Sequence, residues 1–253
     1  MNALLTDAHI ALISARLSTI ESKKDRLVFK YVGHNFSQPK AREYAHHGFA
    51  RRLGTLARCI ENVFRLVAPN STEVPQKEVL YDAAINIQAA IGNIYGCADN
   101  LAWVWVFERG MAIDRKDVGL RKHHKKVRET FSQEFSSYLA SLDPWFEYLV
   151  EYRDAFAHRI PLYVPPGGPL EKDHERAQEL ENLKSAALNA LDACEYERLR
   201  EEQEKLFVFG PVMCHSFSEM GAPFAFHPQL IADFLTVEQL GERMLAELQH
   251  PQN

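Results

Sequence analysis

The sequence predicts an all-α protein: a helical bundle of about five or six helices with a small β-hairpin before the C-terminal helix. Apolar residues recur at steps of three and four along most of the chain, which is the spacing of one buried helix face. Pro39, Pro69 and Gly110 stand between those periodic segments. Only one stretch, near the C-terminal end, changes to short apolar runs around turn residues, as a hairpin does.

Composition is that of an ordinary globular chain. The 253 residues include 29 Lys and Arg against 34 Asp and Glu, a net charge of −5, with 46% apolar and 25% charged residues. The mild acidity argues against coating nucleic acid or a membrane through bulk charge, while a local basic site stays open. We expect a single domain over residues 1–253, with its core at about 40–165.

Targeting and metal signals are not evident in the sequence. The four cysteines lie far apart and form no paired motif, which excludes a zinc ribbon and a disulfide scaffold. The N-terminal segment lacks a basic leader, and the longest strongly apolar run, 101–107, is far shorter than the roughly 20 residues of a membrane span. We therefore expect a cytoplasmic protein with reduced thiols, no membrane partner, no cofactor and no metal.

Three helices are predicted in the N-terminal half. Thr6 or Asp7 can cap a first helix, whose pattern becomes irregular after Leu27. A second helix, at about 40–67, keeps one apolar face over five turns. A third helix, at about 75–109, is rich in apolar and small residues, so it is expected to be the central and most buried one. Gly110 suits its C′ position.

The C-terminal half has a more varied pattern. A basic connection over 111–128 leads to a helix at 129–142. Asp143 is expected as the N-cap of another helix, with Pro144 at its first position, and this helix must stop before Pro161. Residues 171–205 predict a charged helix with 11 acidic and 6 basic residues. A β-hairpin is expected at 206–227 around the turn 218–222. The C-terminal helix is expected within 229–249, where Thr236 and Gln239 form a capping box for 237–248.

One motif carries residues suited to catalysis. Arg153 and His158 stand five residues apart near the end of the helix that Asp143 starts. Five residues advance an α-helix by about 140° beyond a full turn and by about 7.5 Å, so the two side chains diverge within one molecule. Two copies around a twofold axis can bring both Arg and both His into one groove.

These residues resemble a known superfamily. The segment RDAFAH, from Arg153 to His158, is similar to the R-x4–6-H signature of the HEPN superfamily, with Asp154 in its polar slot. The longer phrases YRDAFAHRIPLYVPP and NIYGCADNLAWVW resemble an uncharacterised bacterial branch of it. The resemblance covers about residues 40–165. Some active members carry Tyr two residues after the His, where this chain has Ile160.

The resemblance implies a metal-independent endoribonuclease that works as a homodimer, with RNA as its partner. The 2′-hydroxyl would attack the adjacent phosphate, and His158 would take or give the proton. Arg153 would hold the non-bridging oxygens. Asp154 would orient His158 or pair with an arginine.

Two other interpretations stay open. Many members of the superfamily have lost catalysis, so the chain can be a module that binds RNA, a nucleotide or a protein. Alternatively, Arg153 and Asp154 make surface ion pairs while His158 favours the negative end of the helix dipole. A regulatory partner is also compatible with the sequence.

Weaker signals surround this motif. Within the basic connection, four residues are candidates for binding a phosphate backbone, although a solvated loop explains them better. They are Arg121, Lys122, Lys125 and Lys126. Arg51 and Arg52 are expected on the polar face of the second helix. Asp99 and Asn100 stand in an otherwise apolar helix, where a buried carboxylate needs a partner. Asp99 can contact the Arg153 helix or serve as a structural hydrogen-bond acceptor.

Overall fold

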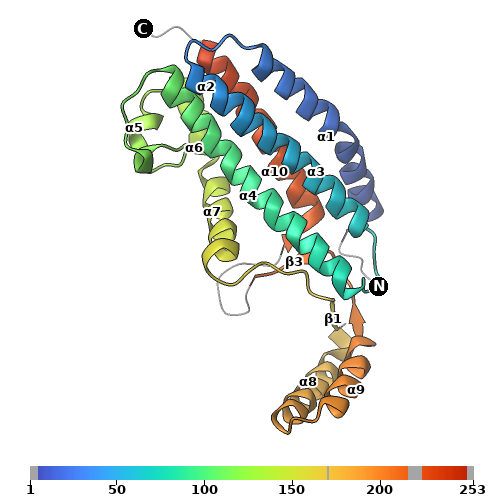
Figure 1. Ribbon diagram of the computed structural model, residues 1–253. Helices are drawn as coiled ribbons and strands as arrows, with labels where there is room; N and C mark the ends of the chain where they lie inside the picture. Colours follow the sequence, from blue (N-terminus) through green and yellow to red (C-terminus); the bar gives the residue numbers. More distant parts are fainter. Residues whose placement is uncertain (1–4, 170, 216–223, 250–253) are drawn as a thin grey trace.

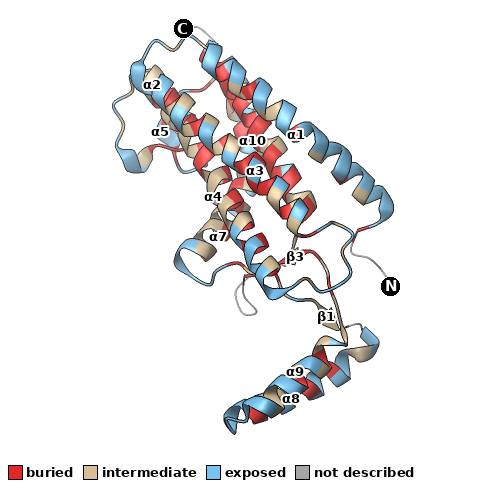
Figure 2. Cartoon of the chain, turned by 45° about the vertical axis from the view of Figure 1, so that its right-hand side comes forward, coloured by how far each residue is buried: buried red, intermediate tan, exposed pale blue. Residues whose placement is uncertain are grey.

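The computed structural model describes residues 5–169, 171–215 and 224–249 (Figure 1). Its main body contains the long helices α1 (Asp7–Gly33), α3 (Ala50–Leu66), α4 (Lys77–Glu108) and α10 (Phe226–Gln249). They lie side by side in both views (Figure 1, Figure 2), with their buried residues turned toward one another. The all-α prediction is confirmed, although the chain forms more helices than the five or six expected.

Helix α1 begins at the predicted N-cap, and its buried apolar stripe is longer than the sequence pattern indicates. The Thr6 hydroxyl accepts a hydrogen bond from the His9 amide at 3.3 Å as the N-cap. The apolar stripe does not end at Leu27, because Tyr31 continues it one turn later and both side chains are fully buried. The helix therefore runs on to Gly33, through a segment whose pattern looked irregular.

Polar contacts hold α1 against α10. The Glu238 carboxylate accepts from Lys23 Nζ at 2.8 Å and from Arg26 Nη2 at 2.7 Å. The Tyr31 hydroxyl donates to the Gly241 carbonyl at 2.9 Å in the buried interface. Gly241 lets the two helices approach this closely, since a Cβ there would lie 2.9 Å from Leu27 Cδ2 of α1.

The C-terminal helix is longer than predicted, and the capping box is wrong. Helix α10 already begins at Phe226, because Phe226 and Phe234 extend its apolar stripe and are fully buried. Thr236 lies in the middle of the helix, where its hydroxyl donates to the Ala232 carbonyl at 2.9 Å.

The predicted second helix is helical throughout but not regular. It consists of α2 (Pro39–Glu43), a π-helical segment η1 (Tyr44–Phe49) and α3. All three segments pack on α4. Val67 is the C-cap, close to the expected end. Helix α4 follows as the predicted central helix, and Gly110 has the left-handed φ of +60° expected after its end.

Short elements connect α4 to the helix that carries the motif. The basic connection contains a 3-10 turn, η2 (Arg115–Asp117), and α5 (Lys125–Arg128), and α6 (Gln133–Ser141) follows. Helix α7 spans Asp143–His158 and packs on α4. Asp143 is its first helical residue rather than its N-cap, and its carboxylate accepts from Arg128 Nη1 at 2.7 Å.

The expected charged helix 171–205 is in fact two helices. After the 3-10 turn η3 (Glu171–Asp173), α8 (His174–Asn189) and α9 (Ala193–Glu204) pair as a hairpin that projects from the body (Figure 1). Leu191 makes the turn between them with a left-handed φ of 57°. The two helices pair because Leu180, Ala187 and Leu199 bury one another in a small separate cluster.

Two antiparallel strand pairs replace the single hairpin expected at 206–227. Strand β3 (Val212–Met213) pairs with β4 (Phe224–Ala225), as the prediction requires, while its turn 218–222 lies outside the described residues. Strand β2 (Phe207–Val208) pairs instead with β1 (Gly168–Pro169) at the base of the projecting hairpin. Gly167 permits this second pairing, because a Cβ there would lie 2.5 Å from the Val208 carbonyl oxygen.

Two helix glycines provide a test of the packing. We expect Gly241→Ala to lower the free energy of unfolding by about 1–3 kcal/mol, because the new methyl group overlaps Phe49 and Leu27. Gly54→Ala, in α3, meets nothing within 4 Å and should instead raise it by about 0.5–1 kcal/mol. Urea unfolding measures both, and equal effects of the two substitutions would contradict the close approach at Gly241.

Candidate functional site

The motif arginine lies against the central helix. Phe156 packs over Gly92 of α4, where an added Cβ would meet its ring at 3.5 Å. One turn earlier on α7, the Arg153 guanidinium stacks at 4.4 Å from the centre of the Tyr95 ring. Its Nη1 also forms an ion pair with Asp154 Oδ1 at 2.9 Å, and 28% of the Arg153 side chain stays exposed. The group is thus oriented by contacts and still open to solvent.

Two more arginines reach the same region of α4. The Arg121 guanidinium lies 5.7 Å from the Tyr95 ring centre. From α3, Arg52 Nε donates to Asn100 Oδ1 at 3.0 Å. Gly96 makes room for Arg52, because a Cβ there would lie 2.5 Å from the Arg52 Cζ. We call Arg52, Arg121 and Arg153 the arginine cluster.

Asp99 lies on α4 between these cations. Burial raises the pKa of its carboxyl to about 6, even though the neighbouring Arg121, Arg153 and Arg52 all favour the charged form. Within the described part of the chain, its carboxylate has no hydrogen bond or ion pair. Three guanidinium groups therefore face two carboxylates, that of Asp99 and the Asp154 partner of Arg153. The excess positive charge suits an anionic ligand such as a phosphate.

His158 is not part of the arginine cluster. It is exposed in the last turn of α7, while Arg153 faces α4, as their spacing on the helix predicts. No hydrogen bond or ion pair of the His158 side chain occurs among the residues described. One chain by itself therefore presents the arginine and the histidine of the motif in different directions.

The basic residues of the connection 111–128 differ in their contacts. Lys122 pairs with Glu147 of α7, and Lys126 Nζ lies 2.6 Å from Asp117 Oδ2. Lys125 is exposed. Of the four basic residues singled out in the sequence, Arg121 alone joins the arginine cluster.

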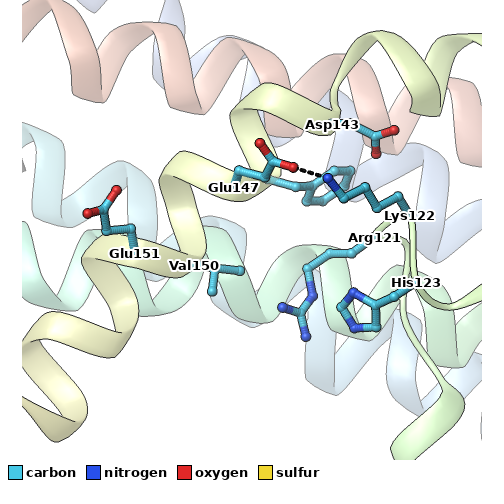
Figure 3. Close-up of a pocket in the computed structure, with 8 residues that line it drawn as sticks. Arg121, Lys122, His123, Asp143, Glu147, Val150 and Glu151 are labelled. Atoms are coloured by element: carbon cyan, nitrogen blue, oxygen red, sulfur yellow. Dashed lines mark hydrogen bonds and ion pairs between the residues drawn. The ribbon is translucent and has the colours of Figure 1, made fainter. Parts of the chain in front are cut away.

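A small pocket adjoins the cluster through Arg121. It lies between residues 121–123 and α7 and has a volume of about 230 Å³ (Figure 3). Among the described residues, no group of three or more His, Cys, Asp and Glu side chains is arranged to hold a metal ion.

Sequence reasoning missed two members of the site. Arg52 was expected on a solvated helix face, and Tyr95 was not singled out. The usable signal was the glycines at 92 and 96, which stand on either side of Tyr95 in the interior of the predicted helix. Glycine in a helix interior costs stability, so its presence there points to close approach by a neighbouring group.

Comparison with known proteins yields no match: no family model, curated protein or solved structure is similar to this chain. In the described residues, no helix combines the length and apolarity needed to span a bilayer.

The environment of Asp99 predicts a pH-dependent stability. Its pKa rises from 3.8 to about 6 on folding, so the folded state binds the proton more tightly than the unfolded state. Stability from this group is complete below the unfolded pKa and is lost as pH rises through the folded pKa. We expect Asp99→Asn to match wild type near pH 4 and to be more stable by about 1–3 kcal/mol at pH 8. Urea unfolding at both pH values measures this.

Asp82→Asn is the matched control for that experiment, because Asp82 lies on the same helix and is exposed. Its unfolding free energy should follow wild type at both pH values. A stability difference for Asp99→Asn that is the same at pH 4 and pH 8 would contradict the raised pKa.

Proposed function

We propose that this chain is an RNA-binding protein of HEPN type that cleaves RNA as a homodimer without a metal ion. The observation that supports this most is the arginine cluster, in which three guanidinium groups gather around Asp99 beside an aromatic ring. Guanidinium groups bind phosphate oxygens bidentately, and RNA presents one phosphate per nucleotide.

The proposed reaction needs two groups besides the phosphate-binding arginine. A base removes the proton from the 2′-hydroxyl, the oxygen attacks the phosphorus, and the bond to the 5′-oxygen breaks as that oxygen gains a proton. The products are a 2′,3′-cyclic phosphate and a 5′-hydroxyl end. Histidine can perform both proton transfers near neutral pH. In this proposal Arg153 of one copy binds the phosphate, while His158 of the other copy moves the proton.

The second candidate is a binding module without catalysis. Two observations favour it: Arg153 already has Asp154 as an ion-pair partner, and His158 has no group that orients its ring in the described chain. Catalytic histidines are usually held by a third residue. The two candidates share the arginine cluster and differ only in what His158 does.

Cleavage of labelled single-stranded RNA in excess EDTA separates these candidates. We expect wild type to cut and to leave the cyclic phosphate. His158→Ala should lower the rate by about 10²–10⁴-fold through loss of proton transfer. Arg153→Ala should lower it by about 10²–10³-fold through loss of charge stabilisation. Matched controls are His174→Ala, an exposed histidine on α8, and Arg58→Ala, an exposed arginine on α3. Both should cut like wild type.

A mixture of the two inactive variants tests the composite site. Random pairing of Arg153→Ala with His158→Ala makes half of all dimers mixed, and each mixed dimer retains one intact site of two. Such a mixture should recover about a quarter of wild-type activity. No recovery, with mixed dimers present, would exclude sharing of the site between copies.

The experiment also distinguishes RNA binding from RNA cleavage. If wild type binds RNA through Arg153 but never cleaves it, the binding-module candidate is correct. If it neither binds nor cleaves RNA, the ribonuclease and an RNA-binding module are both wrong.

A further inference from the structure

The pocket beside the arginine cluster has an apolar part to its lining. Phe146 and Val150 of α7 line it, and Phe146 is only 4% exposed. Arg121 and His123 line it from the basic connection (Figure 3). The volume of about 230 Å³ is below the roughly 300–1,000 Å³ of pockets for drug-sized ligands. It suits a single flat ring system rather than a larger molecule.

The carboxylates that line the pocket differ in whether they already have a hydrogen-bond or ion-pair partner. Asp143 accepts from Arg128 at 2.7 Å, and Glu147 pairs with Lys122, so both carboxylates have partners. The Glu151 side chain has no hydrogen bond or ion pair within the described residues. Its backbone carbonyl, by contrast, accepts a hydrogen bond from Arg159 Nη2 at 3.0 Å. Glu151 is thus a carboxylate with acceptor capacity to spare at the pocket.

Arg121 supplies the complementary donors. Its guanidinium lies in the pocket and also beside Tyr95, and it makes no hydrogen bond in the part of the chain that the structure describes. Beside it, burial and the neighbouring cations Arg121 and Lys122 lower the pKa of His123, so that ring is neutral at pH 7. A neutral imidazole and a guanidinium plane are both surfaces on which RNA bases stack.

We propose that this pocket is a nucleobase subsite that prefers guanine, in which Glu151 accepts from the adjacent ring N–H and amino group and Arg121 donates to the opposite edge. Guanine has this pair of adjacent donors together with the O6 and N7 acceptors that arginine favours. Uracil offers one N–H between two carbonyl groups, which face a carboxylate unfavourably. The subsite rests on the proposed function, because Arg121 belongs both to the pocket and to the arginine cluster that would hold the phosphate.

Binding of RNA that cannot be cut tests the subsite separately from catalysis. The probes are fluorescein-labelled 2′-O-methyl heptamers of uridine whose central base is G, A, C or U, and fluorescence anisotropy in EDTA reports the dissociation constants. We expect wild type to bind the G heptamer about tenfold more tightly than the U heptamer, as one bidentate base contact provides. Glu151→Gln should bring that ratio close to one, because the amide loses the paired acceptor oxygens for guanine and no longer repels the uracil carbonyl groups.

Three further variants make the result specific. Glu129→Gln, an exposed carboxylate outside the pocket, should keep the tenfold preference. Val150→Phe fills the pocket from a half-buried position and should abolish the preference, with circular dichroism checking that the protein folds. Arg153→Ala should weaken all four heptamers alike, because it acts on the phosphate.

The outcomes separate the subsite from the proposed function. Equal affinities for all four heptamers, or a G preference that survives in Glu151→Gln, would overturn the subsite while Arg153-dependent binding keeps the proposed function. No binding of any heptamer by wild type would overturn both.

Discussion

The burial of α4 is the constraint on which the rest of this structure depends. α3, α7 and α10 all pack on this helix, and it is lined with small residues that let them approach. Its buried small positions are Ala83, Ala84, Ala90, Gly96, Cys97, Ala98 and Ala102. A helix covered on so many sides has little room for polar side chains. Asn93, Asp99 and Asn100 are therefore confined to the region where arginines of other elements meet them.

The electrostatics of the candidate site follow from that confinement. Asp99 loses water by being on α4, and this loss outweighs the attraction of three nearby guanidinium groups, so the pKa of its carboxyl rises instead of falling. At pH 7 the Asp99 carboxylate is still largely ionised, so the three arginines face two carboxylates, those of Asp99 and Asp154, and keep an excess of positive charge. Arg52 is held by asparagine side chains and Arg153 by a ring and a neighbouring carboxylate, contacts that orient the groups without saturating their donors. A phosphate can use the donors that remain.

Much of the fold follows from local patterns. Thr6 begins α1, Gly110 follows α4, and Asp143-Pro144 marks the start of α7, because caps, glycine conformations and proline act within a few residues. The predictions were wrong for helices whose bounds depend on tertiary packing. Residues 171–205 form two helices because Leu180 and Leu199 bury each other across a turn. Helix α10 runs through Thr236 because the apolar residues before it are covered by the body.

The sequence by itself determined roughly where most of the long helices lie, which one is central, and that Arg153 and His158 diverge on one helix, since each depends on helical periodicity alone. Only the tertiary structure decided that Arg52 and Arg121 join Arg153 around Asp99, while Lys122 and Lys126 turn to carboxylates of their own. The reason is physical: a side chain's partner across an interface depends on how α3, α7 and the loop between α4 and α5 pack on α4. That packing depends on contacts between residues far apart in the chain, which a local pattern cannot specify.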